Sequence, residues 1–244
     1  MKKSVLIVGG SSGIGRAIAL KFAENNYDVF ATYNNSEVED LKFSCENLGA
    51  RFESFKLDVK SYSDYEKLFA WLKNEAEYLE CVVYCAGLSL DEKLLFDEKL
   101  EDIDDIIDVN LKGGIYCAKE AAQYFSKVKH GSIILISSIY GIYGGACESV
   151  YSAAKGGLIA LSKALSQECG NFNVRVNCVA PGCIETKMTE KYIKTEKTQL
   201  ESATPMGRIG QPEDVASTVF FLASDEASFI TGEAITVSGG AVRF

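Results

Sequence analysis

Tyr151 and Lys155 lie four positions apart in the segment SVYSAAKGGLIALSKALSQE, in which small and apolar residues recur at helical spacing. Residues at this spacing share one face of a helix, so we expect the phenol and the ammonium to be neighbours. A tyrosine hydroxyl has an ordinary pKa of about 10 and is a poor acid or base near neutrality. A nearby ammonium favours the phenolate, so we expect Lys155 to lower the pKa of Tyr151 and make it a usable proton donor or acceptor. Taken alone, the spacing also fits an exposed tyrosine beside a solvated lysine.

A glycine-rich turn near the amino terminus is the second chemical signal. The apolar run SVLIV, at residues 4–8, leads directly into GGSSGIG and then into a helical stretch at residues 16–23. This order predicts a strand, a turn and a helix whose positive end and backbone N–H groups face an anionic phosphate. A plain strand-to-helix connection would use a similar turn. The residues expected to line the phosphate site are Gly9, Ser11, Ser12, Gly13, Ile14 and Gly15.

The elements that must position these residues follow from an alternation of apolar runs and amphipathic stretches. Strand-like runs occur at 4–8, 28–33, 51–57, 81–85, 132–137, 174–180 and 234–237, separated by segments of helical length. The alternation predicts an α/β fold: a single-domain, Rossmann-type, doubly wound parallel sheet of about seven strands with helices on both faces. In such sheets ligands bind beyond the carboxyl ends of the strands. The glycine turn, Ala86-Gly87, Ser138 and Pro181-Gly182 all follow strands and are expected to meet there.

Composition favours one globular domain spanning residues 1–244. The chain has 47% hydrophobic and 24% charged residues, which is ordinary for a protein with one sizeable core. Its net charge of −9 argues against nonspecific binding to nucleic acid or to an anionic membrane. We find no apolar run of about 18 residues, and the amino-terminal apolar stretch is too short for a signal peptide, so we expect a cytoplasmic protein.

The eight cysteines and the single histidine exclude several kinds of catalytic site. The cysteines show no Cys-x-x-Cys pairing, so we expect neither a metal site nor a disulfide framework. Cys81 and Cys85 are predicted to be small buried residues of a strand. His130 precedes Gly131 in a predicted turn and is expected to lie in a surface loop rather than to act as a base. Ser-His-Asp and Cys-His catalysis are therefore largely excluded.

Taken together, the motifs resemble those of the short-chain dehydrogenase/reductase family. They occur in the order GGSSGIG, Ala86-Gly87, VNLKG, ISS, YSAAK and PGCIET, and the resemblance extends to the terminal ITGEAITVSGG. It implies a catalytic tetrad of Asn110, Ser138, Tyr151 and Lys155. Ser138 would hydrogen-bond the substrate oxygen, Tyr151 would exchange a proton with it, and Lys155 would also hold the nicotinamide ribose. Asn110, in an irregular stretch of its helix, would position a water on the proton path.

The resemblance also implies contacts with a nicotinamide cofactor. Beyond the glycine turn and the tetrad, these contacts involve Asn34, Asn35, Asp58, Val59, Ala86, Gly87, Pro181, Gly182, Ile184 and Thr186. The family usually has two asparagines before Ala-Gly, whereas this chain has Tyr84 and Cys85, a departure that bears on local stability and adenine contacts.

Cofactor choice depends on the end of the second predicted strand. The stretch Thr32-Tyr33-Asn34-Asn35-Ser36 has no acidic residue to accept hydrogen bonds from the ribose 2′-hydroxyl of NAD. Its neutral donors can hold a 2′-phosphate instead. We therefore expect NADP(H) as the cofactor, with NAD(H) as the alternative.

Within the family, phrases such as HGSIILISS and TPMGRIGQPEDVA are most similar to bacterial 3-oxoacyl-acyl-carrier-protein reductases. This likeness implies NADPH-dependent reduction of a carbonyl to a hydroxyl on a small-molecule or acyl-thioester substrate, and a role in fatty acid biosynthesis. Acyl carrier protein would be a partner, with Lys127 and Lys129 facing its acidic surface. One alternative is a short-chain dehydrogenase acting on a hydroxysteroid, a sugar or polyol, or a small ketone. Another is a nonenzymatic nucleotide-sensing protein on the same fold.

The family likeness further implies a mobile lid and an oligomer. The lid would span residues 185–208, and the substrate pocket would be formed by Ser138, Tyr140, Tyr143, Cys183 and Met188. Relatives pair through the helix that carries Tyr151 and the helix before it, so we expect a homotetramer.

Overall fold

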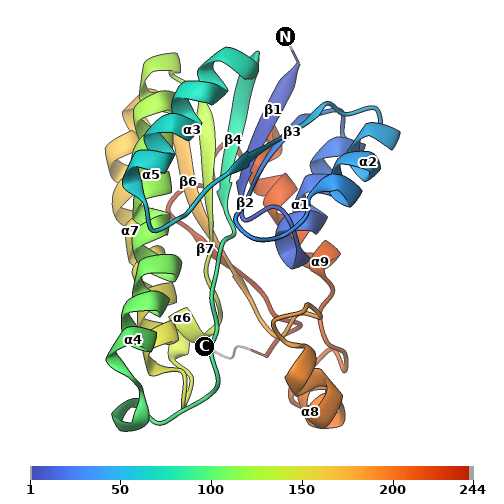
Figure 1. The fold of residues 1–244 in the computed structure, drawn as a ribbon, viewed down its shortest axis with the longest axis vertical. Coiled ribbons are helices and arrows are strands. Elements are labelled where there is room, and N and C mark those ends of the chain that lie inside the picture. The colour runs from blue at the N-terminus through green and yellow to red at the C-terminus, as the bar shows by residue number, and fades with distance from the viewer. Residues whose placement is uncertain (1, 242–244) are drawn as a thin grey trace.

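Seven apolar segments form one parallel sheet in the computed structural model, which describes residues 2–241 (Figure 1). The strand order is β3-β2-β1-β4-β5-β6-β7, and every neighbouring pair is parallel. The inner strands are buried and rich in β-branched and other apolar residues, whereas the two edge strands, β3 and β7, are only partly buried. The strands are β1 (Lys3–Val8), β2 (Asp28–Tyr33), β3 (Phe52–Lys56), β4 (Tyr78–Tyr84), β5 (Gly131–Ile136), β6 (Val174–Pro181) and β7 (Ala234–Val237).

Helices cover both faces of the sheet. In Figure 1 one layer lies to the right of the strands and the other to their left. The right-hand layer contains α1 (Gly13–Glu24), α2 (Glu39–Asn47) and α9 (Pro212–Ala223). The left-hand layer contains α3 (Tyr62–Glu75), α4 (Leu100–Ile107), α5 (Gly113–Val128) and α7 (Ser149–Cys169), with a π-helical turn (Asp108–Lys112) between α4 and α5. Two further helices, α6 (Tyr140–Tyr143) and α8 (Glu190–Ala203), lie at the lower end of the view.

The period-two alternation of a strand divides the core into two halves. On β1, Val5 and Ile7 pack against the layer of α1 and α9, whereas Leu6 and Val8 pack against the layer of α3, α5 and α7. All four side chains are fully buried. The predicted fold class is therefore confirmed, with helices on both faces of a seven-stranded parallel sheet.

The direction of strand order reverses at β1, which pairs with β2 on one side and β4 on the other. At such a reversal the loops that follow the two central strands move apart to opposite faces, and a crevice opens beyond their carboxyl ends. The turn after β1 and the loop after β4 border this crevice. The fold thus brings together residues that are far apart in the sequence.

Two predictions about single residues need correction. Cys81 is buried as expected, but Cys85 is only partly buried and borders the crevice because it follows the end of β4. His130 is half-buried rather than a free surface residue: its ring stacks on Tyr78 and its Nε2 lies 3.2 Å from Oε1 of the buried Glu80. Within residues 2–241, no helix is both long and apolar enough to cross a membrane.

Candidate active site

Glycines allow the turn after β1 to approach its neighbours closely. Gly9 has φ +83°, and a Cβ on it would lie 2.6 Å from the backbone nitrogen of Ala86, in the loop after β4. A Cβ on Gly15 would lie 2.1 Å from the carbonyl oxygen of Gly9. The N–H of Gly9 also donates to Oγ1 of Thr32, at the end of β2 (3.1 Å). The turn is therefore fitted against the ends of both neighbouring strands.

The amino terminus of α1 presents free donors to this turn. Ser12 precedes the helix in an extended conformation and makes no side-chain cap, and the first turn, residues 13–16, contains no acidic residue. Uncapped N–H groups and the positive end of the helix dipole favour an anion. The residues present therefore fit the phosphates of a dinucleotide.

The crevice has a volume of about 720 Å³ and joins the predicted cofactor residues. It extends from the glycine turn, past the ends of β2, β4 and β5, to the segment after β6. The predicted residues that line it are Gly9, Ser11, Ser12, Gly13, Ile14, Gly15, Asn34, Asn35, Asp58, Val59, Ala86, Gly87, Ser138, Tyr151, Lys155, Pro181, Gly182, Ile184, Thr186 and Met188.

Tyr151 and Lys155 lie on α7, one helical turn apart, where the crevice meets Ser138 after β5. Lys155 is 4% exposed, and its Nζ donates to the carbonyl of Ile136 (3.0 Å). The Nζ also lies 5.7 Å from the centroid of the Tyr151 ring. The hydroxyl of Ser137 donates to the Lys155 carbonyl (2.8 Å), which fixes α7 against the end of β5. The predicted pair is thus adjacent in space.

The pKa of Tyr151 is raised and not lowered as expected. Burial raises the pKa of Tyr151 to about 12, and interaction with Ser138 only partly opposes the rise. Burial also lowers the pKa of Lys155 to about 8. Both shifts have the same main cause, because loss of solvent disfavours the charged form of each group. The Lys155 ammonium donates its hydrogen bond to the Ile136 carbonyl. The net shift of the Tyr151 pKa is therefore upward, and the predicted net lowering is wrong for this structure because loss of solvent is the largest cause of the shift.

A carboxyl group near the tyrosine was missed by the sequence argument. Glu148 directly precedes α7, and burial, with the charges of Glu92 and Glu98, raises its pKa to about 7. The charge of Glu148 in turn contributes to the raised pKa of Tyr151. Its position three residues before Tyr151 was visible in the sequence. The approach of Glu92 and Glu98 was not, because they lie about 50 residues earlier.

Asn110 lies in the π-helical turn and is fully buried. Its Nδ2 donates to the carbonyl of Leu88 (2.7 Å), and its Oδ1 accepts from the Leu88 N–H (3.0 Å). A Cβ on Gly87 would lie 3.2 Å from Oδ1 of Asn110 and 3.5 Å from Nζ of Lys155, so Gly87 lies between the two groups. The irregular helix predicted around Asn110 is present, and a water-positioning role remains a prediction.

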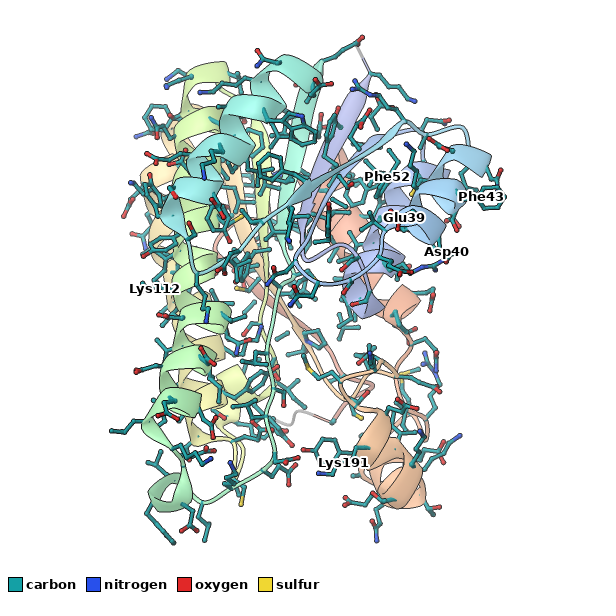
Figure 2. All side chains as sticks on the ribbon, in the orientation of Figure 1. Glu39, Asp40, Phe43, Phe52, Lys112 and Lys191 are labelled. Atoms are coloured by element: carbon teal, nitrogen blue, oxygen red, sulfur yellow. The ribbon has the colours of Figure 1, made fainter. Side chains whose placement is uncertain are left out.

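The entrance to the crevice is flanked by α8. Thr186, before this helix, would touch a Cβ on Gly13 at 3.4 Å, so the start of the predicted lid meets the glycine turn. Figure 2 shows Lys191 on α8; its Nζ forms an exposed ion pair with Asp91, on the loop after β4 (2.8 Å). Exposed pairs of this kind contribute little stability, so the contact is compatible with movement.

Several lining residues were not predicted. In the described part of the chain they include Leu57, Lys60, Leu88, Asp105, Val109, Lys187 and Thr189. Most of them directly follow a strand or adjoin a predicted site residue, which is the signal that would have found them. Conversely, Asn110, Tyr140, Tyr143 and Cys183 are not among the lining residues. Tyr140 packs edge-on against Tyr143, which is 53% exposed.

The end of β2 carries no carboxylate at the crevice: its lining residues are Thr32, Tyr33, Asn34, Asn35 and Ser36. Arg16, in the first turn of α1, pairs with Asp40 of α2 at 3.2 Å, and Figure 2 shows Asp40 beside α1.

The fold and the site together define a class of protein. A doubly wound sheet carries a phosphate-binding turn after β1, and a tyrosine and a lysine lie in the same crevice beside Ser138. These features are typical of nucleotide-dependent oxidoreductases.

Comparison with known proteins narrows this class. A family model described as enoyl-(acyl carrier protein) reductase matches residues 8–242. The 3-oxoacyl-(acyl-carrier-protein) reductase FabG of Thermotoga maritima is 37% identical over 241 residues, and that of Escherichia coli is 36% identical over 238 residues. The alignments cover 98% of this chain in both cases, and 98% and 96% of the respective relatives. A solved structure titled "ElxO with NADP Bound" superposes with a TM-score of 0.92 at 33% identity, covering 99% of both chains.

The chain belongs to the short-chain dehydrogenase/reductase family. It is an NAD(P)-dependent oxidoreductase that acts on a carbonyl or hydroxyl group. The family resemblance and the reaction class predicted from the sequence are therefore confirmed.

Proposed function

We propose that this enzyme reduces the keto group of a 3-oxoacyl thioester carried by an acyl carrier protein, with NADPH as the reductant. Curated relatives of that name are 35–38% identical to this chain over nearly its whole length. The observation that carries the proposal is the position of Tyr151: a phenol that keeps its proton at neutral pH lies beside Ser138 and Lys155 in the dinucleotide crevice.

These side chains can perform the proton chemistry of the reduction. When bound in the crevice, the nicotinamide would supply a hydride to the carbonyl carbon. Ser138 holds the carbonyl oxygen by a hydrogen bond, and Tyr151 donates its proton to that oxygen as the carbonyl becomes a hydroxyl. The phenolate left behind is stabilised by the Lys155 ammonium. Burial keeps Tyr151 protonated before the reaction, which suits it to the direction of reduction.

The end of β2 supports the choice of NADPH. Asn34, Asn35 and Ser36 line the crevice without an acidic group that would repel a 2′-phosphate. Two solved structures that are 33% identical to this chain carry NADP or NADPH in their titles. We assign the cofactor contacts to the crevice residues given above, and the tetrad roles to Asn110, Ser138, Tyr151 and Lys155.

Docking of an acidic carrier requires a local positive surface on a chain of net charge −9. We assign this role to Lys127 and Lys129 at the end of α5. Lys129 lies with its Nζ 4.1 Å from the centroid of the Phe172 ring. We further assign residues 185–208 to a substrate lid, and the faces of α5 and α7 to the contacts of a cytoplasmic homotetramer.

The proposal is tested by measuring NADPH oxidation with several substrates. Acetoacetyl thioesters of acyl carrier protein and of a short pantetheine should be reduced, the former with the higher kcat/KM. A 2-enoyl thioester, a steroid ketone and a keto sugar should be poor substrates, and NADH should replace NADPH inefficiently. Preferential reduction of the enoyl thioester, the ketosteroid or the sugar would overturn the substrate assignment, and no turnover of any of them would favour a nucleotide-sensing role.

Removal of the tyrosine hydroxyl tests the mechanism separately. Tyr151→Phe should lower kcat by about 100-fold or more, because general acid catalysis contributes on this scale. The Kd for NADPH, measured by fluorescence titration, should change less than about threefold, since the ring is retained. A variant with near-normal kcat would contradict the assigned proton donor.

A further inference from the structure

Tyr84 connects the end of β4 to the π-helical turn that carries Asn110. It is the last residue of the strand, and its side chain is fully buried in the half of the core formed with α3, α5 and α7. Its hydroxyl donates a hydrogen bond to the carbonyl of Val109. Val109 directly precedes Asn110 and lines the crevice. A buried hydroxyl from the sheet thus contacts the backbone of the turn.

A π-helical turn needs such partners because its hydrogen-bond register differs from that of the flanking helices. One extra residue per turn is less stable than continuous α-helix, and the register persists only where the surroundings hold it. Here the turn is held from two positions on one segment. Tyr84 contacts the carbonyl of Val109, and Leu88 makes two backbone hydrogen bonds with the side chain of Asn110.

The segment between these two anchors borders the reaction site. Cys85, Ala86, Gly87 and Leu88 all line the crevice, and Gly87 lies between Asn110 and the Lys155 ammonium. A shift of the π-helical turn relative to β4 would therefore move Asn110 and Gly87 against Lys155. The distances involved are short, since a Cβ on Gly87 would already be 3.5 Å from Nζ of Lys155.

Two glycines at the start of α5 make room for the tyrosine. A Cβ on Gly113 would lie 2.6 Å from the Tyr84 hydroxyl oxygen, and a Cβ on Gly114 would lie 3.3 Å from the Tyr84 ring. Burial raises the pKa of Tyr84 well above its ordinary value, so the hydroxyl remains a donor throughout the working pH range. Tyr84 therefore packs closely against Gly113, Gly114 and the π-helical turn at the same time.

We propose that Tyr84 is a positioning residue for the reaction: through the Val109 carbonyl it holds the π-helical turn in the register that sets Asn110 and Gly87 against Lys155. This inference rests on the proposed function only where kcat and KM are measured; the hydrogen-exchange measurement does not depend on it. Loss of the hydroxyl leaves the buried Val109 carbonyl without this partner, and relaxation toward α-helical register would turn Asn110 away from Leu88.

The test compares Tyr84→Phe with Tyr124→Phe, which removes a partly buried hydroxyl nearer the other end of α5. Tyr84→Phe should lower kcat about 10-fold to 100-fold with the KM for substrate and the Kd for NADPH within about twofold, as expected of misplaced groups. Tyr124→Phe should retain wild-type kinetics. Hydrogen exchange by mass spectrometry should speed up at 108–114 in Tyr84→Phe and stay unchanged across α7.

Wild-type kcat in a folded Tyr84→Phe, or parallel changes of kcat and KM without faster exchange at 108–114, would overturn the proposal. If Tyr84→Phe does not fold, Gly113→Ala presses on the same hydroxyl from α5 without deleting it. Its Cβ would also lie 3.0 Å from the carbonyl oxygen of Val59 at the cofactor site, so for this variant kcat at saturating NADPH and the exchange rates at 108–114 decide, with the same expected directions. Any carbonyl that the wild type reduces can serve as substrate. Should the wild type reduce no 3-oxoacyl thioester, the proposed function fails, while the exchange rates still decide the role of Tyr84.

Discussion

At the scale of single residues, Tyr151 and Lys155 have protonation states suited to reduction. Burial moves the two pKa values in opposite directions, to about 12 for the phenol and about 8 for the ammonium. At pH 7 the phenol therefore keeps the proton that it must donate, and the lysine keeps the charge that stabilises the phenolate after donation. The residue types alone suggested an activated tyrosine, and only the burial of both groups gives the direction of the shifts.

The titration of Lys155 predicts how reduction depends on pH. We expect kcat/KM to be constant at about pH 6–7 and to fall above about pH 8, because a neutral lysine no longer stabilises the phenolate. Tyr151 contributes no loss in this range, since its pKa is about 12. The measurement is a pH profile of kcat/KM, which reports the pKa values of the free enzyme. Lys155→Arg, if active, should lack the decline near pH 8, and a decline that persisted in this variant would assign the titration elsewhere.

Glu148 predicts a pH dependence of stability. Its folded-state pKa, about 7, lies above its ordinary value of 4.5, so its deprotonated form is disfavoured by folding. The destabilisation is absent below about pH 4.5, grows between about pH 4.5 and pH 7, and reaches its full size above about pH 7. We expect Glu148→Gln to increase the free energy of unfolding by about 1 kcal/mol at pH 8, a value reduced by the partial exposure of this side chain. Urea unfolding at pH 4.5 should give equal stabilities for variant and wild type, and a gain of the same size at both pH values would contradict this account.

At the scale of elements, the sequence predicted what depends on local pattern. All seven strands were predicted from strand-like runs, because the inner strands are buried and mostly apolar, and the partly buried edge strand β3 still carries Phe52 and Phe55. The glycine turn was predicted because its glycines follow directly after an apolar run. In the structure the backbone packs so closely around Gly9 and Gly15 that a Cβ on either residue would clash. The link from Tyr84 to Val109 could not be predicted, since it joins residues 25 positions apart through tertiary packing. The contacts of Glu148 escaped prediction for the same reason.

The glycine turn supports a prediction about cofactor binding. Gly15→Ala places a Cβ 2.1 Å from the carbonyl oxygen of Gly9, so the turn must open and its N–H groups must move away from the phosphate site. We expect the Kd for NADPH to rise by about 10-fold or more, since charge-assisted hydrogen bonds are lost. Gly170→Ala is the matched control, because apart from its own helix and chain neighbours no described atom lies within 4 Å of its Cβ position, and its φ is −55°. Equal NADPH affinities for the two variants, measured by titration calorimetry, would exclude a close fit of the turn to phosphate.

At the scale of the whole molecule, chain topology brings the site residues together, and the net charge limits which surface an acidic partner could use. The reversal of strand order at β1 brings residues from position 9 to position 189 around one crevice of about 720 Å³. This assembly follows from a parallel sheet and was predicted once the alternation of strands and helices was recognised. The net charge of −9 works against association with an acidic carrier, so any productive docking must use a local basic surface.

That requirement gives a prediction that separates docking from chemistry. Lys129 lies at the end of α5 with φ +60°, so Lys129→Asn removes its charge while keeping a residue that tolerates the left-handed conformation. We expect kcat/KM for a 3-oxoacyl carrier protein to fall about threefold to tenfold at low salt, with kcat/KM for a short pantetheine thioester unchanged. The loss should shrink as ionic strength rises, because screening weakens the attraction in the wild type as well. Lys42→Asn removes the same charge on α2, in the opposite helix layer, and should leave both substrates unaffected. If Lys129→Asn impaired both substrates equally, Lys129 would act on the fold or the reaction, and the carrier would have to dock elsewhere.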